Sequence, residues 1–169
     1  MTSVILFRHG PAEARDPRRW PNDSDRPLAR DGLAETRKAA RGIALLEPRV
    51  RTVISSPAER ARATAEIARK ELGVDRALVL WPELGPDATA SPILARLSSA
   101  TRSAGFAMLV GHEPTLGELV GLCVSGDAIS VARLGRAGAA RIDFPQAPLP
   151  GGGVLEWLLT RKQLSQVAR

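Results

Sequence analysis

Short apolar runs alternate with longer amphipathic segments along most of this chain, and this alternation restricts the fold more than any other feature of the sequence. The apolar runs have the length of buried strands, whereas the segments between them repeat apolar residues at helical spacing. Strands that alternate with helices form a sheet with helices packed on both faces. We therefore predict an α/β protein: a single-domain, three-layer α/β/α sandwich around a mostly parallel sheet, formed by residues 1–169.

Six apolar runs are predicted as strands, of which the last two close the sheet. They are residues 3–8, 52–55, 78–81, 106–110, 139–144 and 154–159. Helices are predicted at residues 29–46, 57–72 and 91–101, and in a segment that presents Leu116, Leu119, Val120 and Cys123 on one face. A polar, proline-rich loop extends from the first strand to about Pro27.

The helix at residues 57–72 has the clearest sequence signals for its ends. Ser56 is predicted as the N-cap, Pro57 as the first helical residue and Glu59 as the third, which together form a capping box. Gly73 predicts the end of the helix. Arg60 then lies in the first turn, close to the carboxyl end of the preceding strand.

Composition excludes several classes of protein. Of the 169 residues, 44% are apolar and 25% are charged, which is typical of globular chains. No run of about 18 apolar residues could span a membrane, and no leader-like segment follows Met1, so we expect a cytoplasmic location. The one cysteine, Cys123, rules out an internal disulfide framework and a cysteine metal cluster.

The net charge of +6 raises the question of nucleic-acid binding. The arginines, however, are interspersed with acidic residues, as in PAERARATAEIARKE, instead of forming a basic run. Aromatic residues make up 4% of the chain and tyrosine is absent, which leaves few side chains on which bases could stack. We predict no nucleic-acid partner and a basic surface that attracts anions, phosphate among them.

The two histidines of the chain occur in the same local context. His9 follows the apolar run at residues 3–8, and His112 follows the run at residues 106–110. In open α/β sheets, ligands bind outside the carboxyl ends of the strands. Since Arg60 also follows a predicted strand, we expect these side chains to meet at one edge of the sheet.

Arginines and imidazoles that converge at strand ends form a site for a dianion. Arg8 and Arg60 would offer permanently charged, planar donor pairs suited to phosphate oxygens. Nearby positive charge lowers the pKa of an imidazole and keeps it neutral and nucleophilic. No cluster of acids or cysteines in the sequence suggests a metal centre, so we expect neither metal nor cofactor and predict phosphoryl transfer through histidine.

Three motifs resemble those of the histidine phosphatase superfamily. They are RHG at residues 8–10, SSPAERARATA at residues 55–65 and VGHEP at residues 110–114. The resemblance extends over nearly the whole chain and implies the fold of the phosphoglycerate mutase-like enzymes. It implies that His9 is the nucleophile that becomes phosphohistidine. It also implies that Arg8, Arg60 and His112 bind the transferred phosphoryl group.

Within this superfamily the chain resembles the compact, SixA-like phosphohistidine phosphatases. Only residues 61–111 separate Arg60 from His112, which is too short for the lid insertion of larger members. DRPLARDG at residues 25–32 is similar to a family motif, although the threonine of that motif is Ala29 here. By this analogy Arg26 helps to bind phosphate. An open groove implies a substrate histidine on the surface of another protein.

The residue that protonates the leaving group is the least defined part of the predicted site. Many members of the family that the chain resembles use a glutamate in the loop before the last helices. Glu83 in WPELGPD is the first candidate here, with Asp87 the second. An imidazole leaving group has a conjugate-acid pKa of about 6.5 and departs more easily than an alkoxide. A phosphohistidine phosphatase therefore tolerates a poorly placed acid.

Alternative functions stay open on the sequence alone. The first is a phosphomonoesterase of the same superfamily that acts on a small molecule such as a nucleotide or sugar phosphate. The second is a phosphate-binding module without turnover, against which the presence of His9 argues. The phosphorylated substrate and the oligomeric state are not defined by the sequence.

Overall fold

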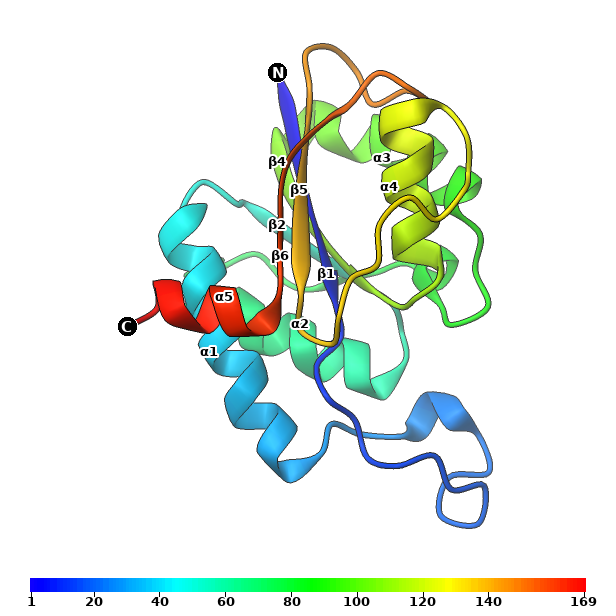
Figure 1. Ribbon diagram of the computed structural model, residues 1–169, viewed down its shortest axis with the longest axis vertical. Coiled ribbons are helices and arrows are strands. Elements are labelled where there is room, and N and C mark those ends of the chain that lie inside the picture. Colours follow the sequence, from blue (N-terminus) through cyan, green and yellow to red (C-terminus); the bar gives the residue numbers. More distant parts are fainter.

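The computed structural model describes the backbone of residues 1–169 and, apart from residues 100–104, their side chains. One six-stranded sheet with the order β3-β2-β4-β1-β5-β6 runs through the centre of the molecule (Figure 1). Its strands are β1 (Thr2–Arg8), β2 (Thr52–Ser55), β3 (Val79–Leu80), β4 (Phe106–Gly111), β5 (Ala139–Phe144) and β6 (Val154–Leu159). The helices are α1 (Arg30–Leu46), α2 (Glu59–Glu71), α3 (Ala90–Ala104), α4 (Thr115–Ser125) and α5 (Arg161–Val167).

The first four strands are parallel and the last two are antiparallel. β1 pairs with β4 from Ser3 to Arg8, so that Arg8 lies opposite Gly111 at their carboxyl ends. β2 pairs in parallel with both β4 and β3, whereas β5 runs antiparallel to β1 and β6 antiparallel to β5. The predicted α/β class and the mostly parallel sheet are thus confirmed.

Two apolar clusters lie on opposite faces of the sheet and explain the three layers. One joins Leu6 and Leu109 to Leu97 of α3 and Leu119 of α4. The other joins alternate residues of the same strands to α1, α2 and α5, with Leu164 as the contribution of α5. Since successive side chains of a strand point to opposite faces, the fully buried runs of β1 and β4 supply both clusters.

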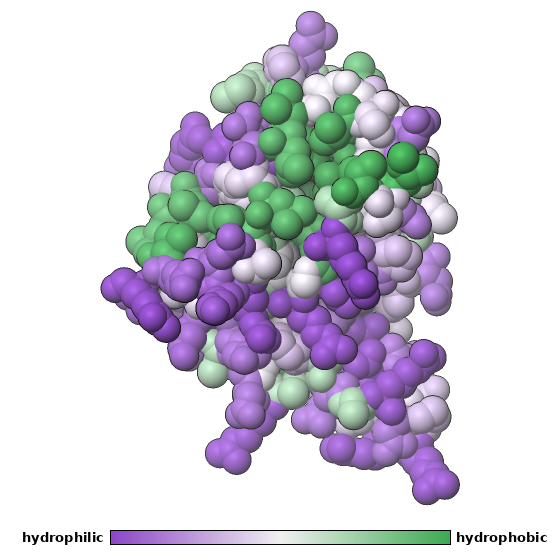
Figure 2. Space-filling model, in the orientation of Figure 1, coloured by the Kyte–Doolittle hydropathy of each residue, from purple (hydrophilic) through white to green (hydrophobic). Residues whose placement is uncertain are grey.

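In the view of Figure 1, the surface has a hydrophobic upper part and a hydrophilic lower part. Figure 2 shows hydrophobic side chains gathered over the upper part of this face and hydrophilic ones over the lower part, where the loop between β1 and α1 lies. The carboxyl ends of the parallel strands point towards this lower, hydrophilic part. None of the helices, over their described residues, is long and apolar enough to cross a membrane.

The structure corrects the sequence prediction at two helices. The capping box of Ser56, Pro57 and Glu59 is wrong: α2 begins at Glu59, its N-cap is Ala58, and no side chain caps it. The N–H of Ala58 does donate to the Ser56 hydroxyl, but that hydroxyl also bonds His112. α5 was not predicted, because its seven residues are too few for a periodic pattern.

Candidate active site

The two histidines meet at the edge of the sheet where β1, β2 and β4 end. The backbone N–H of His9 donates to the carbonyl of Gly111 across 3.1 Å, which continues the pairing of β1 with β4. The N–H of Ser56 donates in the same way to Val110 across 2.9 Å. The rings of His9 and His112 lie 5.0 Å apart between centroids, and both residues are at least 93% buried.

The glycine of the RHG motif lets α1 pack closely against the segment that follows β1. A Cβ atom on Gly10 would lie 1.8 Å from the Thr36 hydroxyl of α1, which is far inside contact distance. The N–H of Gly10 donates to the hydroxyl of Thr64 across 3.0 Å, and that hydroxyl donates to the carbonyl of Arg60 across 2.7 Å. Thr64 therefore ties the turn that carries His9 to the first turn of α2, which carries Arg60.

Backbone carbonyls hold both site arginines in the same manner. Nη1 of Arg8 donates to the carbonyl of Leu134 across 2.9 Å, and Nη1 of Arg60 donates to the carbonyl of Asp23 across 2.7 Å. Among the side chains that the structure describes, three buried polar atoms lack a hydrogen-bond partner. Two of these are Nε of Arg8 and Nε of Arg60, and the third is the Thr52 hydroxyl.

An unpaired buried donor is costly, so its retention in two neighbouring guanidinium groups indicates a ligand-binding function. In both groups Nη1 is held by protein. The edge of Arg8 formed by Nε and Nη2 can grip a phosphate with two parallel bonds, whereas Arg60 offers Nε, because its Nη2 contacts Asp23. The arrangement suits a tetrahedral oxyanion, whose several oxygens can accept from both arginines at once.

The hydrogen bond of His9 defines which ring nitrogen carries the proton. Its Nδ1 lies 2.7 Å from the carbonyl oxygen of Gly10. Because a carbonyl only accepts, Nδ1 carries the proton of the neutral ring and Nε2 carries the lone pair. His112 bonds the Ser56 hydroxyl through Nε2 across 2.9 Å, which leaves its Nδ1 for another partner.

Both imidazoles are neutral at physiological pH. Burial lowers the pKa of His9 to about 4, and the positive charges of Arg60 and Arg8 add to the effect. Burial is also the largest cause that lowers the pKa of His112, to about 3, and the charges of His9, Arg60 and Arg8 lower it further. A neutral imidazole next to permanently charged guanidinium groups is available as a nucleophile without prior deprotonation.

Asp23 is a component of the site that the sequence did not reveal. Its carboxylate forms an ion pair with Nη2 of Arg60 at 3.1 Å and accepts a hydrogen bond from Nε of Arg26 across 2.9 Å. The hydrogen bond from Arg26 lowers the pKa of Asp23, an effect that the charge of Arg60 reinforces. Its only sequence signal is the spacing of three residues from Arg26, which is common on protein surfaces.

Arg26, a predicted phosphate ligand, lies beside Arg60 because both contact Asp23. Its Nη1 donates to the carbonyl of Glu13 across 2.8 Å, while Nε and Nη2 face the carboxylate of Asp23. Arg26 therefore adds positive charge to the pocket, but its donors are shared with protein groups.

Glu113 is a second component that the sequence did not reveal. Its Oε1 accepts from the N–H of Leu134 across 2.9 Å, and the carbonyl of the same Leu134 holds Arg8. Glu113 thus fixes the segment that positions Arg8, one residue after His112. Burial raises the pKa of Glu113, while the N–H of Leu134 and the charge of Arg8 oppose this effect.

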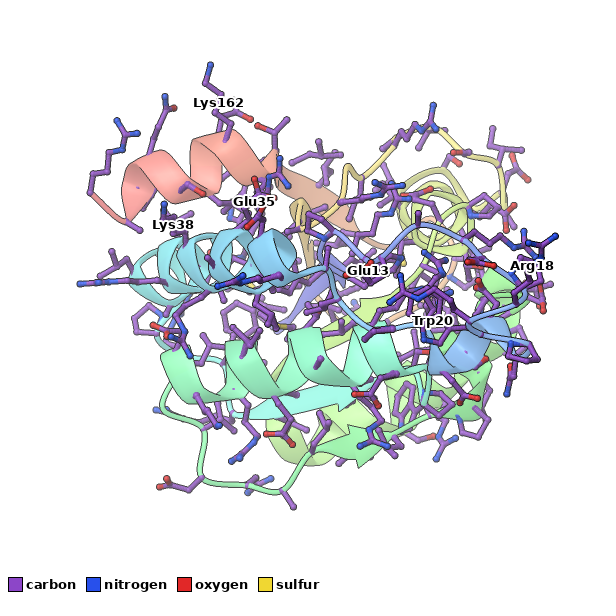
Figure 3. All side chains as sticks on the ribbon, turned by 90° about the horizontal axis from the view of Figure 1, so that it is seen from below. Glu13, Arg18, Trp20, Glu35, Lys38 and Lys162 are labelled. Atoms are coloured by element: carbon purple, nitrogen blue, oxygen red, sulfur yellow. The ribbon has the colours of Figure 1, made fainter. Side chains whose placement is uncertain are left out.

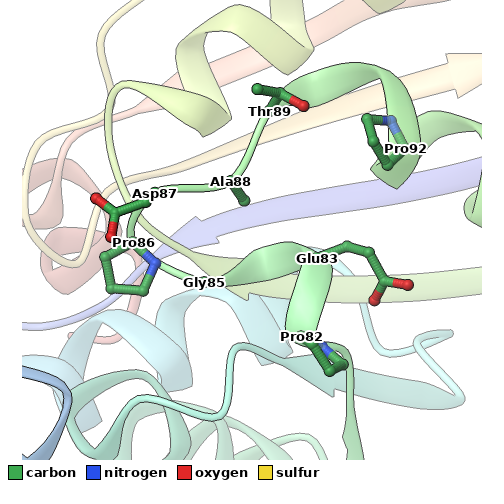
Figure 4. Close-up of a pocket in the computed structure, with 8 residues that line it drawn as sticks. All are labelled: Pro82, Glu83, Gly85, Pro86, Asp87, Ala88, Thr89 and Pro92. Carbon is green, nitrogen blue, oxygen red and sulfur yellow. The ribbon is translucent and has the colours of Figure 1, made fainter.

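The predicted proton donors lie in a neighbouring hollow, which Figure 4 shows. Both oxygens of Glu83 contact Nη1 of Arg96, at 2.8 and 2.6 Å, and in this contact the carboxylate is an acceptor. Asp87 lies on the opposite side of this loop, the side towards which β1 points (Figure 4). The following carbonyl, of Ala88, accepts from Thr115, three residues after His112. The residue after Asp87 is thus tied to the first turn of α4, which follows His112.

The described part of the chain contains no group of side chains that could hold a metal ion. Within it, no three side chains of His, Cys, Asp or Glu lie close enough together to ligate an ion. The cationic groups of the pocket are instead arginines.

Comparison with known proteins finds a family and a relative with similar sequences. The model of the histidine phosphatase superfamily (branch 1) matches residues 4–85. An uncharacterized protein of Picosynechococcus sp. is 34% identical over 149 residues, which cover 82% of this chain and 87% of that protein.

Solved structures of phosphatases share the fold. The protein histidine phosphatase SixA complexed with tungstate superimposes with a TM-score of 0.84 at 24% identity, over 96% of this chain and 99% of that one. The α-ribazole phosphatase from Shigella flexneri gives a TM-score of 0.73 at 17% identity, over 95% and 97% of the two chains. A phosphoserine phosphatase from Entamoeba histolytica gives 0.68 at 17%, over 97% and 100%.

The fold and these matches define a phosphatase. The chain belongs to the histidine phosphatase superfamily.

Proposed function

We propose that this chain is a phosphohistidine phosphatase that acts on proteins and uses His9 as its nucleophile. The observation that carries this proposal is the pairing of a neutral His9, with its lone pair at Nε2, and two guanidinium groups whose Nε donors have no protein partner. Nucleophile and oxyanion donors are thus arranged before the substrate arrives, which is the main requirement for phosphoryl transfer.

The reaction proceeds in two displacements. Nε2 of His9 attacks phosphorus, the bond from phosphorus to the substrate nitrogen breaks, and the electron pair of that bond stays on the leaving imidazole. Arg8, Arg60 and His112 bind the equatorial oxygens during this transfer. Water then attacks the phosphorus of phospho-His9, releases inorganic phosphate and restores the neutral ring. Asp87 or solvent supplies the proton to the leaving group.

The segment between Arg60 and His112 supports a protein substrate. It consists of the rest of α2, then β3, the short turn Pro82–Leu84, α3 and β4. α3 does not cover the pocket, since Ile93, Leu94 and Leu97 pack it into the core on one face of the sheet. A pocket without a lid can admit an imidazole carried on a protein surface.

The similarity to an α-ribazole phosphatase and a phosphoserine phosphatase favours a second candidate, a phosphomonoesterase for small molecules. Both candidates predict that the His9→Asn substitution abolishes turnover and that the variant protein still binds vanadate. They differ in kcat/KM, which we expect to be at least about a hundredfold higher on a phosphohistidine protein than on α-ribazole phosphate or phosphoserine. The opposite ratio would establish the small-molecule function.

The covalent step is tested by rapid quenching in alkali followed by mass spectrometry. Phosphate on His9 during turnover is the expected result, because the phosphorus–nitrogen bond survives alkali. Active enzyme that carries phosphate elsewhere, or an active His9→Asn variant, would exclude the mechanism.

A further inference from the structure

A second hollow, of about 560 Å³, lies between α1 and α5 and is distinct from the phosphate pocket. Its charged lining consists of five basic side chains and one acidic one: Lys38, Arg41, Arg161, Lys162, Arg169 and Glu35. Glu35 forms an ion pair with Arg161. Lys38, Arg41 and Lys162 have no carboxylate partner among the side chains that the structure describes. We call this hollow the α1–α5 groove.

The α1–α5 groove opens near the edge of the sheet that carries His9. Leu159 at the end of β6 pairs with Ala139 of β5, and the N–H of Ala137 donates to the carbonyl of His9. The end of β6 is thus about two strand spacings, or about 10 Å, from His9. α5 begins two residues later, at Arg161. Figure 3, seen from this edge, shows Lys38 and Lys162 on one side and Trp20 in the loop between β1 and α1 on the other.

Unpaired cations that line one groove repel each other, so the groove favours an anionic partner. Its described lining contains no aromatic side chain on which a base could stack. Carboxylates spread along an extended peptide match cations spread over two helices better than one small anion does. A peptide rises about 3.3 Å per residue, so its third residue from a histidine held in the pocket already reaches the end of β6.

We propose that the α1–α5 groove binds an acidic segment of the protein substrate, about three to six residues from the phosphohistidine. The inference rests on the proposed function and specifies which phosphohistidine proteins the enzyme prefers. Exposed charge pairs are individually weak and sensitive to salt. Three or four together are expected to raise kcat/KM about tenfold at low ionic strength.

The test uses two synthetic phosphohistidine peptides of equal length. One has glutamates at positions three to six on both sides of the phosphohistidine, and the other has glutamines there. At about 50 mM salt, where screening is weak, wild-type enzyme should prefer the acidic peptide about tenfold in kcat/KM. Lys38→Glu/Lys162→Glu should abolish the preference. The control, Lys70→Glu/Arg76→Glu, makes the same change in net charge at exposed positions outside the groove and should retain it.

The outcomes separate this inference from the proposed function. Equal rates of wild-type enzyme on the two peptides would contradict the proposed role of the α1–α5 groove. Equal losses in both double variants would contradict it as well. Neither result would affect the proposed phosphatase activity. If neither peptide is hydrolysed although p-nitrophenyl phosphate is, the phosphohistidine assignment fails and the inference fails with it. Loss of the preference in the groove variant alone, with unchanged turnover of p-nitrophenyl phosphate in all three proteins, is the expected result.

Discussion

Acidification between pH 8 and pH 5 is expected to destabilise the fold strongly, because the site buries two neutral imidazoles. The pKa of His9 is about 4 and that of His112 about 3 in the folded chain, against about 6.5 in the unfolded one. The unfolded state therefore binds more protons than the folded state once the pH falls below 6.5. Stability is fully present above pH 6.5 and declines progressively until the folded histidines also titrate, near pH 4 and below.

The magnitude follows from linkage. At pH 5 the medium is 1.5 units below the unfolded pKa and above both folded values, so each histidine accounts for about 2 kcal/mol of lost stability. The pair accounts for about 4 kcal/mol, a large part of the 5–15 kcal/mol that is typical of a whole domain. Asp23 and Asp143, whose pKa values are lowered in the folded state, add losses only at more acidic pH, which is why pH 5 is the lower limit.

Urea unfolding at pH 8 and pH 5, in phosphate-free buffer, measures this difference. His112→Asn is the control. The free energy of unfolding of each protein at pH 5 is compared with its own value at pH 8, and the variant, which has one titrating histidine fewer, should lose about half of the pH dependence. NMR offers a direct check, since a chain with two histidines gives two Hε1 signals to follow. A midpoint near 6.5 for either ring in the folded protein, or a difference below about 1 kcal/mol, would refute the reasoning.

Three further predictions concern the groups around the histidines. Glu113→Ala should raise KM and the inhibition constant of vanadate about threefold to tenfold, the effect of one lost hydrogen bond, with a smaller change in kcat. Glu113→Gln keeps an acceptor for Leu134 and should restore most of the loss; equal defects in both variants would contradict a positioning role. Glu83→Gln should slow phosphohistidine hydrolysis by less than about tenfold, as should Arg96→Gln, which breaks the same ion pair. A hundredfold loss confined to Glu83→Gln would show that Glu83 donates the proton. Activity should survive excess EDTA, and vanadate should compete with substrate; loss on chelation that one divalent ion reverses would contradict an arginine-based pocket.

The positions of the histidines and Arg60 could be predicted because each depends on a local rule. Apolar runs mark the parallel strands, and the carboxyl ends of such strands meet at one edge. His9 and His112 follow two of these runs within two residues, and Arg60 lies in the first turn of the helix after a third. The pairing of β1 and β2 with β4 then brings all three to one edge. The structure adds a physical reason for the glycine of the RHG motif, since a Cβ atom there would clash with Thr36 of α1.

The groups that hold the arginines could not be predicted, because they act through contacts between distant segments. Asp23 reaches Arg60 from a loop 37 residues earlier, and Leu134 reaches Arg8 from 126 residues away. Neither contact has a periodic or motif signal. The failed capping box has a related cause, since the hydroxyl of Ser56 bonds His112, a tertiary partner that local helix rules do not include.

In the mechanism that we propose, the low pKa of His9 has opposite effects on the two displacements. A less basic nitrogen is a weaker nucleophile towards the substrate, but it is a better leaving group when water attacks phospho-His9. The substrate imidazole, with an ordinary pKa of about 6.5, would hold the phosphoryl group more firmly than His9 does. In the proposed mechanism, transfer to His9 therefore depends on binding of the phosphoryl oxygens by Arg8 and Arg60, whose Nε donors are unpaired. Hydrolysis of the intermediate is then favoured by the same burial that keeps His9 neutral.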